Sequence, residues 1–273
     1  MIGKTIPTIL PLIIILIHLG WPQVEQPYPP LNLVNIPTAG TLPRGSFTVE
    51  TLLSKDGAFT PKLSVGFSDN FSLGISFGIQ NLIGDKKPFM NKTTPEIQIK
   101  YRVFDESQTM PALVYGLDTQ GRGIYTNTDT IFMPKDSIIT LNRYEQKAWG
   151  MYMVMSKNWN VLGNLGIHAG FCKSLTENDD GDNDINYFFG IDKELNRSFS
   201  LLVEYDAALN DNLDNDYQLD DISFGKGKGY LNAGLRWAIS SNLMMEINFN
   251  DISQNTNAEY TNREIKIMYS ESF

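Results

Sequence analysis

Large apolar residues alternate with small or polar residues along residues 59–80. The alternation runs up to Phe67, is interrupted by a Ser-Asp-Asn sequence at residues 68–70, and resumes at Phe71. Because successive side chains of a β-strand point to opposite faces, this pattern predicts a β-hairpin with one apolar and one polar face.

The same alternation recurs up to the last residue and predicts about 12 strands, an even number, as in bacterial single-chain outer-membrane barrels. Two of these strands form the hairpin at residues 59–80. The strand at residues 148–156 has apolar residues on both faces, so its facing stays open. The other predicted strands lie at residues 45–53, 96–103, 110–117, 164–171, 185–192, 199–207, 230–238, 245–250 and 264–273.

Short and long connections alternate between these strands. Short turns are predicted near residues 69, 105, 157–160, 195 and 240, and mostly long loops near residues 85, 118–145, 180, 215 and 255. Outer-membrane barrels have short periplasmic turns and longer external loops. The sequence therefore predicts an all-β fold, a single transmembrane antiparallel up-and-down β-barrel at residues 45–273. A soluble β-sandwich or soluble barrel would explain any single strand equally well.

Two segments precede the predicted barrel. Residues 1–23 carry Lys4 and then an apolar run of about 15 residues, which predicts a secretory signal peptide. Residues 24–44 are rich in proline, which cannot donate to a β-ladder, so an extended, irregular segment is expected there. This segment is either a partial plug in the barrel mouth or a periplasmic tail.

Composition narrows the classes of partner. The formal net charge of -9 argues against nucleic acid and anionic bilayer surfaces as partners. Cys172 is the only cysteine, so an intramolecular disulfide and a cluster of metal-bound thiolates are excluded. No long apolar run follows residues 5–19, which excludes a helical membrane protein. We expect a bacterial outer-membrane protein whose partners are outer-membrane lipid and the outer-membrane assembly machinery, with no cofactor.

The polar faces of the predicted strands carry ionisable side chains of both signs. A barrel of this size has a narrow interior, in which opposite charges can pair. We therefore expect either a polar conduit or binding site, or a salt-bridged interior that only satisfies buried charge. The residues assigned to the lumen are Lys62, Glu96, Lys100, Arg102, His168, Asp192, Glu204, Asp206, Arg236, Glu246, Glu264 and Lys266.

Catalytic and metal sites have weaker signals. His168 could act as a general base with Ser64 or Ser200 as the nucleophile, but no spacing connects them and no G-x-S-x-G sequence occurs. The main prediction is therefore that the protein is not an enzyme, with an outer-membrane hydrolase acting on lipid or surface glycan as an alternative. Acidic loops near residues 177–184 and 210–221 offer oxygen ligands for Ca²⁺, but the EF-hand spacing is absent and solvated loops are favoured. The candidate calcium ligands are Asp179, Asp180, Asp182 and Asp184.

The last strand carries Tyr269 and ends in Phe273. A terminal aromatic residue after alternating apolar residues resembles the signal that the outer-membrane assembly machinery reads. The last strand must pair with the first, because an open edge in lipid leaves backbone groups unpaired. We expect loss of Phe273 to lower the folded yield.

Two stretches resemble YjbH-like outer-membrane proteins. They are NIPTAGTLPRGSF at residues 35–47 and PALVYGLD at residues 111–118, and GNLGIH at residues 163–168 is similar more loosely. That family is linked to exopolysaccharide production or export and has no established catalytic residues. The resemblance implies a transport, export-accessory or structural barrel with polysaccharide as a partner. An adhesive surface barrel is the other alternative.

Overall fold

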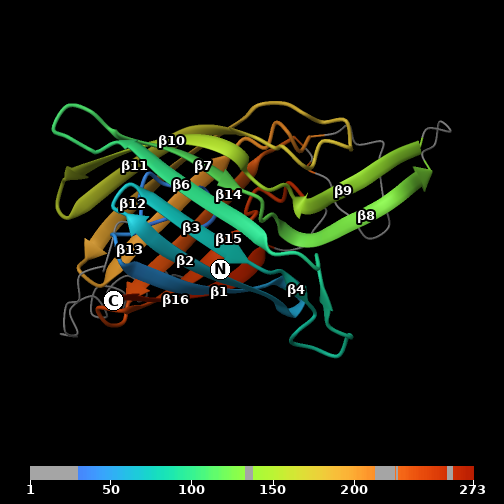
Figure 1. The fold of residues 1–273 in the computed structure, drawn as a ribbon, viewed down its shortest axis with the longest axis horizontal. Coiled ribbons are helices and arrows are strands. Elements are labelled where there is room, and N and C mark those ends of the chain that lie inside the picture. Colours follow the sequence, from blue (N-terminus) through green and yellow to red (C-terminus); the bar gives the residue numbers. More distant parts are fainter. Residues whose placement is uncertain (1–29, 133–137, 213–224, 226, 257–260) are drawn as a thin grey trace, which may run out of the picture.

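Twelve antiparallel strands close into a single barrel (Figure 1). The computed structural model describes residues 30–132, 138–212, 225, 227–256 and 261–273. The barrel is closed because the first strand, β1, pairs with β2 on one side and with β16 on the other. The prediction of an all-β up-and-down barrel is confirmed. The predicted signal peptide at residues 1–23 lies outside the described residues.

The barrel strands follow one another around the cylinder in chain order. Each predicted strand overlaps one of them. A 3₁₀ turn, η1 (Lys55–Gly57), joins β1 to β2, and the short strands β4 (Ile79–Gln80) and β5 (Phe89–Met90) extend the sheet beside β2. The barrel strands are β1 (Ser46–Ser54), β2 (Ala58–Ser68), β3 (Phe71–Ser76), β6 (Glu96–Phe104), β7 (Ala112–Asp118), β10 (Gly150–Asn160), β11 (Asn164–Lys173), β12 (Asn186–Asn196), β13 (Phe199–Asp206), β14 (Tyr230–Ala238), β15 (Leu243–Asn250) and β16 (Asn262–Ser272).

The apolar faces of the strands form the outside of the barrel. Leu63 and Ile97 are each 42% exposed, whereas their neighbours Ser64 and Gln98 point inward and are buried. A soluble barrel would have the reverse arrangement, with its apolar side chains in the interior. A closed barrel with an apolar exterior and a polar interior is an outer-membrane barrel, and the protein is located in the bacterial outer membrane.

The two ends of the barrel differ in their connections. The turn end carries the connections at residues 69–70, 105–111, 161–163, 197–198 and 239–242, whereas the loop end carries the longer ones and η1. By the architecture of outer-membrane barrels, the turn end faces the periplasm and the loop end faces the cell exterior. Among the described residues, no helix is long and apolar enough to span a membrane.

Two predicted connections are wrong. The predicted loop at residues 118–145 contains β8 (Arg122–Phe132) and β9 (Ile138–Gln146), a separate two-stranded sheet that projects from the loop end (Figure 1). Its isoleucine, threonine and tyrosine residues favour strands, although the segment is polar overall. The predicted turn at residues 157–160 belongs to β10, and the chain reverses only at Leu162 and Gly163, which have positive φ angles of 50° and 94°.

Candidate functional site

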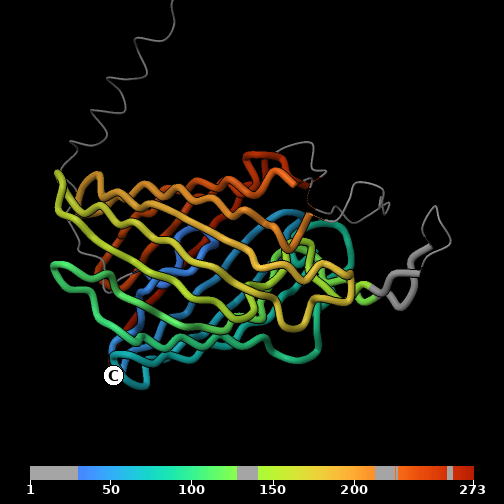
Figure 2. Tube along the Cα trace, turned by 90° about the horizontal axis from the view of Figure 1, so that it is seen from above, coloured from blue at the N-terminus to red at the C-terminus, as the bar shows by residue number. Residues whose placement is uncertain are grey.

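Residues 30–44, which we call the plug, enter the barrel (Figure 2), and all of them except Pro43 and Arg44 are buried or half-buried. The side chains of Leu33, Ile36 and Leu42 are fully buried. For these residues the structure therefore shows a lumenal segment and not a periplasmic tail. The plug adds no strand to the barrel sheet among the described residues.

The plug is a loop whose two arms both lead to the turn end. Its tip is closed by a hydrogen bond from the Leu33 N–H to the Ile36 carbonyl (3.0 Å). Leu31 and Leu42, one from each arm, pack in the same apolar cluster with Met244, which lies at the turn end of β15. The loop could therefore be withdrawn toward the periplasm without threading past the vestibule.

Apolar patches on the inner wall receive the side chains of the plug. Tyr152 and Val154 of β10 point inward and belong to one buried cluster with Leu33 and Ile36. On the opposite face of β10, Met151 is exposed on the outside of the barrel. The facing that the sequence left open is thus fixed, because the plug covers an apolar stretch of the lumen.

Basic side chains of the barrel wall and of β8 hold backbone carbonyl groups of the plug. Lys100 of β6 donates to three of them, and each of three further bases donates to a carbonyl near the tip. A buried carbonyl needs such a partner, and a charged donor is a strong one. The contacts are Lys100 Nζ to the oxygens of Leu31, Thr38 (3.2 Å) and Gly40 (3.4 Å), Arg236 Nη2 to Asn32 (2.8 Å), Lys266 Nζ to Leu33 (3.0 Å) and Arg122 Nη2 to Val34 (2.8 Å).

A carboxylate on β13, the strand next to the one that carries Arg236, holds N–H groups of the plug tip. Glu204 accepts hydrogen bonds from the backbone N–H of Asn35 (2.9 Å) and of Ile36 (3.1 Å). Asn232 Nδ2 donates to the same carboxylate at 2.8 Å. The wall thus recognises the plug through its backbone, with bases on carbonyls and an acid on N–H groups.

His168, Ser156 and Asp192 form a hydrogen-bonded chain beside the plug. Ser156 Oγ lies 2.7 Å from His168 Nδ1, and His168 Nε2 lies 2.7 Å from Asp192 Oδ1. The backbone N–H of Ala39 donates to Ser156 Oγ at 2.8 Å. The chain is complete if Ser156 donates to Nδ1 and Nε2–H donates to Asp192. It therefore anchors the second arm of the plug.

The same residues resemble the parts of a serine hydrolase, but the geometry favours an anchor. The serine at His168 is Ser156, not Ser64 or Ser200. The predicted hairpin could not have found it, because a turn at residues 157–160 pairs Ser156 with residue 161, whereas the observed register pairs Ser156 with His168. The Ala39 N–H points at Oγ, so Oγ lies near the plane of that peptide group. Attack on a carbonyl carbon requires an approach from above the plane, so this arrangement does not cleave the plug.

The bases that hold the plug are themselves paired. Glu246 is fully buried between Arg236 (2.6 Å) and Lys266 (2.7 Å). Glu264 forms an ion pair with Arg122. Because an unpaired buried charge is costly, these carboxylates compensate the bases and hold them oriented toward the plug.

Three other predicted lumen residues lie away from the plug. Arg102 is at the turn end, where Nε lies 2.8 Å from Asp105. Glu96 is at the loop end and accepts a hydrogen bond from the Tyr144 hydroxyl (2.8 Å). Lys62 faces the cavity above the plug.

A vestibule opens from the loop end down to the plug tip. Its empty volume is about 1380 Å³, including space open to solvent. Asn32 and Asn35 of the plug lie at its base, and charges of both signs together with several amides line its walls. Such a lining suits small polar solutes. The wall residues include Glu50, Lys62, Gln98, Asp118, Gln120 and Asn250.

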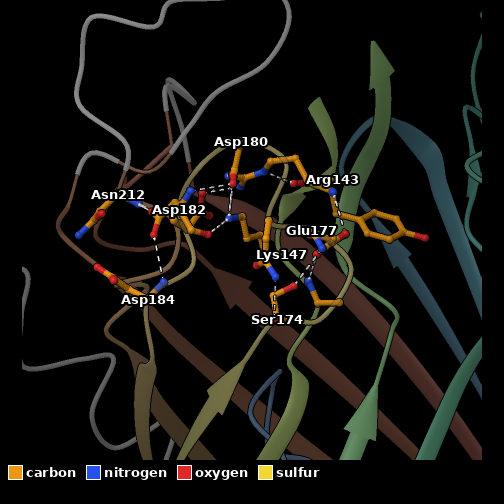
Figure 3. Close-up of polar contacts among 12 residues, drawn as sticks. Arg143, Lys147, Ser174, Glu177, Asp180, Asp182, Asp184 and Asn212 are labelled. Carbon is orange, nitrogen blue, oxygen red and sulfur yellow. Dashed lines mark hydrogen bonds and ion pairs between the residues drawn. The ribbon is translucent and has the colours of Figure 1, made fainter. Parts of the chain in front are cut away.

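A buried ionic network fixes the projecting hairpin to the barrel at the loop end (Figure 3). Arg143 of β9 forms ion pairs with Asp180 (2.8 Å) and with Asp211, and Lys147 lies 2.7 Å from Asp180. Burial alone would lower the pKa of Arg143, but Asp211 and Asp180 raise it above its usual range. The network therefore ties three external segments together.

Glu177 joins this network through backbone groups. Its carboxylate accepts hydrogen bonds from the N–H of Ala148 (2.6 Å) and of Tyr144 (3.1 Å) (Figure 3). Burial raises the pKa of Glu177 to about 7, against the opposing effect of these donors. This contact is thus sensitive to pH near neutrality.

The carboxylates of the candidate calcium loop have other partners. Asp180, only 3% exposed, is bound by Arg143 and Lys147, and Asp182 is also buried, so the expectation of solvated loops is wrong for these two. In the described part of the chain, no group of three or more His, Cys, Asp or Glu side chains is placed to hold a metal ion. Asp179 accepts a hydrogen bond from Asn142, and Asp184 donates its N–H to Asp182. Residues 213–221 of the second acidic loop lie outside the described residues.

The C-terminal aromatic residues lie where the barrel closes. Phe273 is 84% exposed, and its ring stacks on Phe47 of β1 at a centroid distance of 6.3 Å. Tyr269 lies directly opposite Val49 of β1. Their reading by the assembly machinery stays a prediction.

Outer-membrane proteins of known structure resemble this chain in their general fold. No family model and no curated protein matches the chain. It is similar to the KdgM porin, with 10% sequence identity and a TM-score of 0.47 over 84% of this chain and 99% of the porin. It is similar to the NanC porin, with 10% identity and a TM-score of 0.41 over 83% of this chain and 99% of that one. It is also similar to an outer-membrane channel from Pseudomonas putida F1, with 12% identity and a TM-score of 0.43 over 85% of this chain and 97% of the channel. Likenesses at this distance carry no argument about function.

Proposed function

We propose that this protein is a gated outer-membrane conduit for small polar solutes, closed by its own N-terminal plug. The observation that carries the proposal is the binding of the plug through side-chain contacts to its backbone groups. Lys100 and Glu204 hold opposite groups of the same loop, and no ladder joins the loop to the barrel among the described residues. Withdrawal of the plug therefore breaks none of the hydrogen bonds that close the cylinder.

The vestibule supports the direction of passage in this proposal. It reaches from the loop end to the plug tip, so a solute from outside meets Asn32 and Asn35 first. Both arms of the plug lead to the turn end, where a periplasmic force could pull them. Displacement of the loop would connect the vestibule with the periplasm.

The experiment compares the full-length protein with a variant that lacks residues 31–42. Both are reconstituted into liposomes, and heat-modifiable gel mobility verifies that each barrel is folded. Uptake of a small neutral sugar is measured by liposome swelling. We expect slow swelling with the full-length protein and fast swelling with the variant. A folded variant that gives no swelling would refute the conduit.

A second candidate is an accessory role in exopolysaccharide export. The stretch at residues 35–47, which resembles YjbH-like proteins, includes the plug tip and the start of β1. In this proposal the plug would respond to the export of a polymer. Secreted polysaccharide is measured in cells that carry the full-length protein, the variant without residues 31–42, or neither. Equal secretion in all three would exclude the role.

A further inference from the structure

Three lumenal carboxylates on β12 and β13 have no lysine or arginine within 4 Å among the described residues. Each faces the interior and is buried. Their partners are an imidazole and two amides, which carry no full positive charge in their neutral forms. The pairs are Asp192 with His168 (2.7 Å), Glu204 with Asn232 (2.8 Å) and Asp206 with Asn186 (2.6 Å).

Elsewhere in the lumen, bases balance the carboxylates. Glu246 has two cationic partners and Glu264 has one. Glu50 and Asp118 have no ion pair within 4 Å among the described residues. However, Lys62 faces Glu50 in register across β1 and β2, and Lys100 interacts electrostatically with both carboxylates. The uncompensated negative charge of the wall is therefore concentrated on β12 and β13, which we call the acidic strip (Asp192, Glu204 and Asp206).

The plug supplies an independent indication of what the acidic strip binds. At Glu204 it places two backbone N–H groups, the positive ends of peptide dipoles, within 3.1 Å of the carboxylate. The closed state thus satisfies this carboxylate with partial positive charge. When the plug leaves, Glu204 loses both donors and faces the open lumen.

We propose that the opened lumen passes small cations in preference to anions, and that Asp192, Glu204 and Asp206 set this preference. The inference rests on the proposed conduit and names its class of solute. A narrow passage of lowered dielectric with one excess sign of charge attracts ions of the opposite sign, as rings of Asp and Glu do in cation channels. In the open state a passing cation takes the place beside Glu204 that the plug dipoles occupy in the closed state.

The test measures the reversal potential of reconstituted protein in a planar bilayer under a potassium chloride gradient. Openings of the full-length protein and the conductance of the variant without residues 31–42 are both recorded. Two further proteins are compared. The triple variant combines Asp192→Asn, Glu204→Gln and Asp206→Asn. The control protein combines Glu50→Gln with Lys62→Met. The control removes one charge of each sign from the vestibule.

We expect a reversal potential on the potassium side, a shift toward zero in the triple variant, and no shift in the control. A reversal potential near zero or on the chloride side with the acidic strip intact overturns the inference, whether or not the triple variant folds. A folded variant without the plug that does not conduct at all overturns the conduit itself. The two failures are therefore distinguishable.

Discussion

The substitution Glu204→Gln is expected to displace the plug without changing the size of the side chain. One oxygen of the carboxylate accepts hydrogen bonds from the N–H groups of both Asn35 (3.0 Å) and Ile36 (3.1 Å), so a glutamine oxygen in that place keeps both contacts but loses the charge. The NH₂ group then replaces the oxygen that accepts from Asn232, and an NH₂ group cannot accept. A hydrogen bond contributes about 1.5–3 kcal/mol when it is made to a charged group and about 0.5–1.5 kcal/mol when it is made to a neutral one, so the two weakened contacts amount to about 2 kcal/mol. A change of about 2 kcal/mol raises the population of the displaced plug by about 30-fold.

Thiol labelling measures this population. Val34→Cys places a thiol at the buried plug tip, and Cys172→Ser removes the natural thiol. If the plug opens and closes faster than a soluble maleimide reacts, the labelling rate follows the displaced population. Glu50→Gln is the matched control, because Glu50 lies in the vestibule wall and not at the plug contacts described above. Equal labelling rates in the Glu204→Gln and Glu50→Gln proteins would refute the reasoning.

Three further predictions concern the ionic network at the loop end, the face of β6 that contacts lipid, and the closure of the barrel by its last strand. The pKa of Glu177 is raised to about 7 from 4.5, so its contribution to stability is fully present below about pH 4.5 and is lost as the pH rises through about 7. The opening free energy of the Ala148 amide, obtained from its exchange rate after correction for the base-catalysed rise of the intrinsic rate, should therefore be lower at pH 8 than at pH 5 by up to roughly 3 kcal/mol. Glu177→Gln should abolish this difference in opening free energy, and an unchanged difference would contradict the reasoning. Ile99→Arg places a charge on the lipid face, at a cost of about 2–4 kcal/mol near the midplane, and should block assembly, whereas Gln98→Arg points into the vestibule and should not. Equal folded yields by heat-modifiability would show that the facing is wrong. Deletion of Phe273 removes the ring stacked on Phe47 and should lower the folded yield in cells, and a normal yield would show that the terminal ring is dispensable.

The strands and their facing could be predicted because lipid imposes a strict alternation. Leu63 must meet lipid and Ser64 must not, so a shift of register by one residue would expose every polar side chain of β2. The closure of β1 on β16 follows from the same requirement, since an unpaired edge in lipid is costly. The local pattern of apolar and polar residues is therefore enough to predict the barrel.

The plug contacts could not be predicted, because they join residues far apart in the chain. The N–H of Asn35 meets Glu204 across 169 positions, and Lys100 meets the plug across about 60. Proline content indicates an irregular segment but not its location. One signal was present: Tyr152 and Val154 place apolar side chains on a lumenal face, which requires a cover.

The buried ionic network at the loop end was not predicted from the sequence, for a different reason. The segment that carries Arg143 looked like a polar loop, and its partners Asp180 and Asp211 looked like solvated acids. When charges of both signs are buried together, their attraction offsets part of the desolvation cost of each, and composition cannot show that pairing. The hairpin of β8 and β9 could have been found from its strand-favouring residues.

A reversible lock on the plug tests the conduit most directly. The Cγ2 atom of Val34 lies 3.1 Å from the Cβ that a side chain at Gly234 would add, close to the distance of about 3 Å between a disulfide sulfur and the partner Cβ. The protein carries Val34→Cys and Gly234→Cys, together with Cys172→Ser and with Asn248→Ala, because the Asn248 amide oxygen would lie 2.1 Å from the new Cβ. Single barrels in a planar bilayer are recorded before and after addition of a reductant. The account predicts no conductance while the disulfide is intact and discrete openings once it is reduced; conductance in the locked state, or none after reduction, would contradict it.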